Sequence, residues 1–154
     1  MNIGFLGLGK LGLPVSLAVE DKGHNIFGYD ISTQTLEDIK NKHIRYKEEW
    51  VEKFLPNTKL EINNIDDLVK NSEIIFVPIQ TPHDPKYEGI TRIPSKRIDF
   101  DYSYLKSGIK DLSEAIEKKL KSSVKVHRNT FENLEVKKYK YLDAKRAKNI
   151  LINV

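Results

Sequence analysis

The sequence predicts an α/β domain built on a doubly wound parallel sheet. Two observations carry this prediction. Short apolar segments alternate along the chain with segments of helical apolar spacing, which is the order that produces parallel strands joined by helices. A glycine-rich turn also separates the first apolar segment from the first helical one, where such folds bind phosphates. At 154 residues the chain has the length of one domain.

The glycine-rich turn follows the first predicted strand, the apolar run over residues 3–6. Gly7 supplies the tight turn, and Gly9 lacks a Cβ, so that the backbone can approach a pyrophosphate. Gly12 lets the following helix pack closely against the sheet. The free N–H groups and the dipole at the start of that helix form an anion site. The whole turn reads Gly7-Leu8-Gly9-Lys10-Leu11-Gly12.

The next elements complete a β-α-β unit. A helix is expected over residues 13–22, because Gly23 stands where glycine commonly follows a helix. A second strand over residues 25–29 ends on Asp30, which lies 18 residues after Gly12. This is near the spacing of about 20 residues at which an acid accepts the adenosine ribose hydroxyls. A carboxylate there repels a 2′-phosphate, so the sequence predicts NAD rather than NADP as the cofactor.

The alternation of helices and strands continues after Asp30. The apolar, β-branched run at residues 73–77 is typical of a buried parallel strand. In order, the expected elements are a helix capped by Ser32 that runs through Ile39 toward Ile44, a helix over 47–55 that stops at Pro56, a short strand over 59–62, a helix capped by Asn64 or Asp66, and the strand over 73–77.

A long loop follows the last of these strands. It starts with Pro78-Ile79-Gln80-Thr81-Pro82 at the carboxyl end of the strand, where open α/β sheets bind ligands. Residues 83–100 contain no expected strand or long helix, and a loop of that length is usually functional or disordered. Its basic residues are candidates for contacts with substrate phosphates, and a solvated charge cluster is an equal alternative. They are Arg92, Lys96 and Arg97.

A change of charge marks the end of the chain. Asp101 is expected to cap a helix that runs from about Tyr102 to Leu120. Residues 1–117 hold 15 Lys and Arg against 19 Asp and Glu, whereas residues 118–154 hold 11 against 3. This shift predicts a domain over residues 1–119 and a basic tail over 120–154. The tail carries no RNA- or DNA-binding motif, so nucleic-acid binding is not expected.

The composition of the sequence excludes several kinds of functional site. The sequence contains no cysteine, which excludes disulfides, thiolate metal sites and a cysteine nucleophile within these residues. There is no apolar run long enough for a membrane span and no signal pattern at the N-terminus, so we expect a cytoplasmic protein with no membrane partner. The histidines lack metal-ligand spacing and predict no metal site; they are His24, His43, His83 and His127.

Four segments resemble the N-terminal NAD-binding domain of the UDP-glucose/GDP-mannose dehydrogenases. They are residues 3–12, Tyr29-Asp30, residues 76–82 and the D-F-D-Y-S-Y-L sequence at residues 99–105. That family uses two NAD molecules to oxidise the C6 hydroxyl of a nucleotide sugar to a carboxylate. The resemblance covers residues 1 to about 119 and implies a Rossmann-type fold that binds NAD. The cofactor-binding residues that it implies are Gly7, Gly9, Lys10, Leu11, Gly12, Asp30, Thr81 and Pro82.

The resemblance is expected to end near Lys118. The family's Ser-Thr-x-x-Pro-Gly-Thr turn, dimerising helix, sugar-binding domain and catalytic cysteine have no counterpart in the sequence. That cysteine holds the aldehyde-level intermediate as a thioester, so a chain without it cannot run the second oxidation by the family's mechanism. We therefore expect a truncated NAD-binding half with no catalytic residue of its own. It would meet a nucleotide sugar only with a complementing substrate domain.

Two departures and two alternatives accompany this interpretation. Thr35 stands where family members often carry a basic residue, and Lys10 stands where many carry an aromatic one. Lys10 is suited either to reach the pyrophosphate or to remain solvated. The glycine motif would also suit a β-hydroxyacid-type dehydrogenase fragment, although the Gln80-Thr81-Pro82 turn argues against it. The second alternative is a non-catalytic Rossmann interaction module that has lost its ligand.

Overall fold

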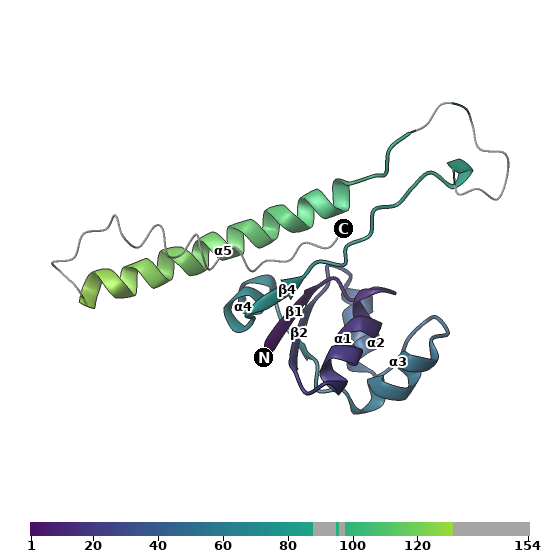
Figure 1. Cartoon of the computed structure of the whole chain (residues 1–154), viewed down its shortest axis with the longest axis horizontal. Coiled ribbons are helices and arrows are strands. Elements are labelled where there is room, and N and C mark those ends of the chain that lie inside the picture. Colours follow the sequence, from purple (N-terminus) through teal and green to yellow (C-terminus); the bar gives the residue numbers. More distant parts are fainter. Residues whose placement is uncertain (88–94, 96–97, 131–154) are drawn as a thin grey trace.

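The computed structural model describes residues 1–87, 95 and 98–130. Four parallel strands form one sheet in the order β3-β2-β1-β4. Figure 1 shows β2, β1 and β4 side by side. The register places β2 directly beside β1 and Gly4 of β1 opposite Ile75 of β4. The strands are β1 (Asn2–Leu6), β2 (Asn25–Tyr29), β3 (Glu61–Ile62) and β4 (Ile74–Phe76), which confirms the predicted parallel sheet.

Helices cover both faces of the sheet, so the doubly wound fold is also confirmed (Figure 1). One apolar layer joins the sheet to α1 (Gly12–Asp21), α2 (Thr33–Lys40) and α3 (Glu49–Phe54), followed by a short 3-10 turn. The other layer joins it to α4 (Ile65–Asn71) and α5 (Ser103–Thr130). The residues that centre the first layer are Phe5, Leu13, Leu17, Ile39 and Val51, and those that centre the second are Leu6, Leu68, Val69, Ile75 and Leu112.

Helix caps follow the predicted side chains closely. The Ser32 hydroxyl accepts a hydrogen bond from the Thr35 N–H at 3.2 Å and starts α2, which ends at Lys40 rather than continuing to residue 44. The Asn64 side chain accepts the Asp67 N–H at 2.9 Å, so Asn64 and not Asp66 is the cap of α4. Gly23 follows α1 with a positive φ of 86°.

The end of α5 differs from the prediction. The helix was expected to stop near Leu120, but it continues to Thr130. Its last ten residues contain neither glycine nor proline, so nothing in the local sequence breaks the helix. The predicted division at residue 119 therefore falls inside one helix, and the tail beyond residue 130 lies outside the described residues.

Two lysines just before this stretch hold α5 against α4. The Lys118 Nζ forms an ion pair with the Asp66 carboxylate at 3.1 Å. The Lys119 Nζ donates a hydrogen bond to the Val69 carbonyl oxygen at 2.7 Å, at the C-terminal end of α4 where carbonyl groups lack helical partners. Both lysines therefore have a structural role in the α/β domain. None of the described helices combines the length and apolar character needed to span a membrane.

The start of α5 makes a testable pH-dependent contribution to stability. The Asp101 carboxylate accepts the Ser103 N–H at 2.9 Å, and this backbone hydrogen bond, with the Ser103 side chain, lowers the pKa of Asp101. A group with a lowered pKa stabilises the fold above its unfolded-state pKa and loses that effect as pH falls through its folded-state pKa. Asp101→Ala should therefore lower the melting temperature slightly at neutral pH and have no effect in strong acid, as thermal melts across the acidic range would show.

Candidate functional site

The predicted turn and the loop after β4 meet at the point where the strand order reverses. β1 lies between β2 and β4, so the carboxyl ends of β1 and β4 are neighbours. Gly7 follows β1 with a φ of +115°, a conformation that favours glycine. A Cβ added to it would lie 3.2 Å from the Pro78 carbonyl oxygen, so the two segments are in contact. Open α/β sheets bind their ligands at this reversal.

The other two glycines of the turn have opposite surroundings. A Cβ added at Gly12 would overlap the Gly7 carbonyl oxygen and approach Pro78 Cγ to 2.9 Å, so the start of α1 fits only without a side chain. A Cβ added at Gly9 would have no atom within 4 Å. Packing within the chain therefore explains the glycine at position 12 but not the one at position 9. The open space beside Gly9 is a cradle that a side chain would fill.

The N–H groups at the start of α1 are directed into this region without partners. α1 has no side-chain cap, and its first backbone bond is from the Leu13 N–H to the Gly9 carbonyl oxygen at 3.0 Å. Within residues 1–87, 95 and 98–130, the N–H groups of Lys10, Leu11 and Gly12 have no hydrogen-bond acceptor. Unpaired N–H groups and the positive end of the helix dipole favour an anion here.

Asp30 joins the turn to the end of β2. One of its carboxylate oxygens accepts the Leu8 N–H at 2.7 Å, and the other accepts the Ser32 N–H at 2.8 Å. Asp30 is half-buried, and each oxygen keeps a further lone pair for a ribose hydroxyl. The carboxylate thus holds the glycine turn in place in addition to its predicted role, a function that the sequence did not reveal.

The side chains of the remaining predicted residues differ in their exposure and contacts. Leu11 is 66% exposed at the start of α1. Lys10 is exposed, with its Nζ 6.0 Å from the centre of the Tyr46 ring. Thr81 is half-buried and Pro82 exposed, and in the part of the chain that the structure describes no hydrogen bond links either of them to the glycine turn.

Tyr46 is a neighbour that sequence analysis missed. Its hydroxyl is buried and has no hydrogen-bond partner among the described residues, and burial together with the nearby charge of Glu48 raises its pKa. Tyr46 lies between α2 and α3, where no motif of the sequence drew attention to it. The described residues contain no cluster of histidine and carboxylate groups suited to a metal ion.

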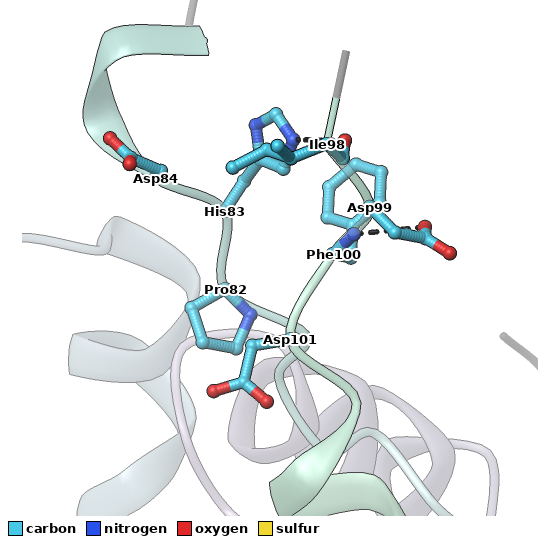
Figure 2. A pocket seen from close by; sticks show the side chains of 7 residues that line it. All are labelled: Pro82, His83, Asp84, Ile98, Asp99, Phe100 and Asp101. Carbon is cyan, nitrogen blue, oxygen red and sulfur yellow. Dashed lines mark hydrogen bonds between the residues drawn. The ribbon is translucent and has the colours of Figure 1, made fainter.

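An open cleft of about 330 Å³ lies further along the loop after β4, beyond Thr81 (Figure 2). The Pro82 carbonyl oxygen accepts the Asp101 N–H at 2.8 Å, which ties the two limbs of this loop together at its base. The His83 ring lies 4.6 Å from the Phe100 ring, centre to centre, and its Nε2 is 3.3 Å from the Ile98 carbonyl oxygen. The residues that line the cleft are Pro82, His83, Asp84, Ile98, Asp99, Phe100 and Asp101.

Three of the seven described residues that line this cleft are aspartates, and their negative charge disfavours phosphates. They are Asp84, Asp99 and Asp101 (Figure 2). Among the described residues, the unpaired N–H groups of the glycine turn therefore offer an anion more favourable surroundings than the cleft does. Arg92, Lys96 and Arg97, the basic residues considered for substrate phosphates, lie outside the described residues.

Comparison with known proteins supplies the family context. The model of the NAD binding domain of the UDP-glucose/GDP-mannose dehydrogenase family matches residues 1–152, well past Lys118, where the resemblance seen in the sequence was expected to end. Protein CapL of Staphylococcus aureus is 34% identical over 83 residues, which are 54% of this chain and 19% of CapL. The UDP-N-acetyl-D-mannosamine dehydrogenase of Pyrococcus horikoshii is 25% identical over 122 residues, which are 77% of this chain and 26% of that enzyme.

Solved structures agree with this result. The UDP-D-ManNAc dehydrogenase of Pyrococcus horikoshii superposes with a TM-score of 0.57 at 27% identity, covering 75% of this chain and 26% of that one. The UDP-glucose dehydrogenase of Pyrobaculum islandicum superposes with a TM-score of 0.60 at 20% identity, covering 77% and 26%, a likeness of fold alone. The present chain therefore spans about a quarter of the length of these relatives or less.

Proposed function

This chain belongs to the UDP-glucose/GDP-mannose dehydrogenase family and matches its NAD-binding domain, and from this premise we propose that it holds NAD on the glycine turn and Asp30. The observation that carries the proposal is the contrast within the turn. Gly12 is required by packing, whereas Gly9 leaves an open cradle beside unpaired N–H groups. A glycine without a packing reason, next to an anion site, is what close approach of a pyrophosphate requires.

The residues present fit the cofactor at both of its adenosine-side groups. The N–H groups of Lys10, Leu11 and Gly12 would bind the pyrophosphate, and the Asp30 carboxylate would accept the ribose hydroxyls. We place the nicotinamide end near Thr81 and Pro82, because the loop that carries them leaves the neighbouring strand β4. When bound, NAD supplies the hydride acceptor of the family's alcohol oxidation. The chain's own residues bind and orient it.

Binding should be visible as a selective stabilisation of the folded chain. A ligand that binds only the folded state raises stability by about 2.7 kcal/mol at a concentration one hundred times its Kd. Millimolar NAD should therefore raise the melting temperature by several degrees, whereas NADP should not, because its 2′-phosphate meets the Asp30 carboxylate. Equal shifts with both nucleotides would remove Asp30 from the ribose site. A cooperative melt that neither nucleotide shifts would support the non-catalytic interaction module.

The substrate and the reaction belong to a larger assembly in this proposal. Relatives named for nucleotide-sugar oxidation are about four times as long as the matched region, and the 154 residues here contain no cysteine. We propose that the chain supplies the cofactor half and that a nucleotide sugar is oxidised only with a substrate domain and its nucleophile. The family match favours a nucleotide sugar over a small β-hydroxy acid.

If oxidation requires a separate substrate domain, the isolated chain should not catalyse the reduction of NAD by a nucleotide sugar. With NAD and UDP-glucose, GDP-mannose or UDP-N-acetylmannosamine, we expect no NADH absorbance above that of the buffer. A small β-hydroxy acid such as 3-hydroxybutyrate should behave in the same way. NADH production that depends on a nucleotide sugar and on Asp30 would show that the chain is a complete catalyst.

A further inference from the structure

Lys10 is a cation in the glycine turn that no carboxylate of the described residues pairs with. It stands between Gly9 and Leu11, and its side chain is exposed. Within the described part of the chain, its ammonium group forms no ion pair and no hydrogen bond. Arg45, by contrast, is held by the Asp38 carboxylate at 2.6 Å. A full positive charge therefore stands beside the unpaired N–H groups at the start of α1.

The ring of Tyr46 gives this ammonium group a favoured position. Lys10 Nζ is 6.0 Å from the centre of the ring, at the outer limit of a cation–π contact. The ring is half-buried, and its hydroxyl is covered although no described group bonds to it. Packing rather than a hydrogen bond of the hydroxyl therefore accounts for the position of the ring. A lysine side chain has many rotamers in solution, so one attractive contact shifts where its charge is found.

We propose that Tyr46 is a positioning residue of the nucleotide site, because its ring holds the Lys10 ammonium group beside the turn, where it attracts the pyrophosphate. This inference rests on the proposed binding of NAD to the turn. Both phosphates of NAD are negatively charged, whereas the helix N-terminus supplies only a partial positive charge. A full cation in the same turn adds an attraction that is strong at low salt and screened at high salt.

α3 carries a lysine with the same kind of contact outside the turn, which makes it a matched control. Lys53 is exposed, and its Nζ lies 5.0 Å from the centre of the Phe54 ring and 5.9 Å from that of Trp50. Lys53→Gln removes one positive charge and one cation–π contact, as Lys10→Gln does. It therefore reports how far net charge alone affects the binding of NAD.

The test is the dissociation constant for NAD, measured by calorimetry on the full chain at about 20 mM and about 500 mM salt. Lys10→Gln should weaken binding about fivefold at low salt and clearly less at high salt, whereas Lys53→Gln should bind like the parent at both. ADP-ribose keeps the pyrophosphate and lacks the nicotinamide, so it should show the same loss. A loss with NAD alone would overturn the proposal, because Lys10 would then act on the nicotinamide end.

Two substitutions of Tyr46 test its part. Tyr46→Leu removes the ring and should weaken NAD binding about threefold at low salt. Tyr46→Phe is the conservative variant, which keeps the ring and should retain the affinity that Tyr46→Leu loses. It also removes a covered hydroxyl without a described partner, so its melting temperature should not fall. Added to Lys10→Gln, Tyr46→Leu should cause no further loss of affinity, because the ring acts through Lys10.

Additive losses in the double variant would overturn the positioning role, since Tyr46 would then support the site by packing alone. A Lys10→Gln chain that bound NAD like the parent would also overturn the proposal, even if Tyr46→Leu did not fold. That outcome would leave the binding of NAD to the turn intact. It is distinct from a failure of the proposed function, in which the parent chain itself does not bind NAD and both proposals fall.

Discussion

Replacing Asp30 by alanine is expected to weaken NAD binding by at least about tenfold and also to destabilise the nucleotide-free chain. Affinity falls because the ribose loses its acceptor. Stability falls because the N–H groups of Leu8 and Ser32 lose the carboxylate oxygens that they reach at 2.7 and 2.8 Å. A buried donor left without a partner costs about 1–3 kcal/mol of folding stability. Because Asp30 is only half-buried, we expect the loss in Asp30→Ala to be near the lower value. Calorimetry and a thermal melt measure the two effects separately.

Two further variants make this prediction specific. Asp38→Ala removes a carboxylate from α2 that pairs with Arg45 on the surface, at 2.6 Å, and it should leave NAD affinity unchanged. Asp30→Asn keeps the shape of the side chain but offers only one acceptor oxygen to two N–H donors, so it should resemble alanine more than the parent. If Asp30→Ala bound NAD as well as the parent chain, the ribose would have to bind elsewhere.

The double role of Asp30 shows where sequence reasoning reaches its limit. The strand, turn, helix and acid could be predicted because each depends on local chemistry, such as a positive φ at Gly7 or the apolar run of β1. The bonds from Asp30 to Leu8 and Ser32 depend on how the turn folds back onto the end of β2. Residues that are 22 positions apart carry no periodic signal of such a contact.

The same limit applies to α5 and to the loop before it. The apolar spacing of Leu105, Ile109 and Leu112 predicted the helix, but its end was expected near Leu120, close to the change in charge that was taken as a boundary. Charge does not stop a helix, and Lys118 and Lys119 bind α4 instead. The sequence also placed Thr81 and Pro82 beside the cofactor by resemblance, and this remains a prediction.

Exchanging each of two glycines for alanine should separate the packing role of the turn from its binding role. Gly12→Ala places a Cβ onto the Gly7 carbonyl oxygen, a backbone atom that cannot move without disturbing the turn. Such overpacking costs about 1–3 kcal/mol or more, so the melting temperature should fall by several degrees. Gly9→Ala places its Cβ in open space, and its φ is not in the left-handed region. The nucleotide-free chain should then melt at the same temperature or slightly higher.

The two substitutions should lower NAD affinity for different reasons. Gly9→Ala fills the cradle beside the unpaired N–H groups of α1, so NAD should bind more than about tenfold more weakly to a chain that is fully folded. Gly12→Ala should lose NAD only to the extent that the turn is distorted, and its loss of stability should appear without nucleotide. A Gly9→Ala chain that melted normally and still bound NAD like the parent would show that no pyrophosphate approaches this backbone. The open space at Gly9, which no contact among the described residues requires, would then need an explanation other than a pyrophosphate.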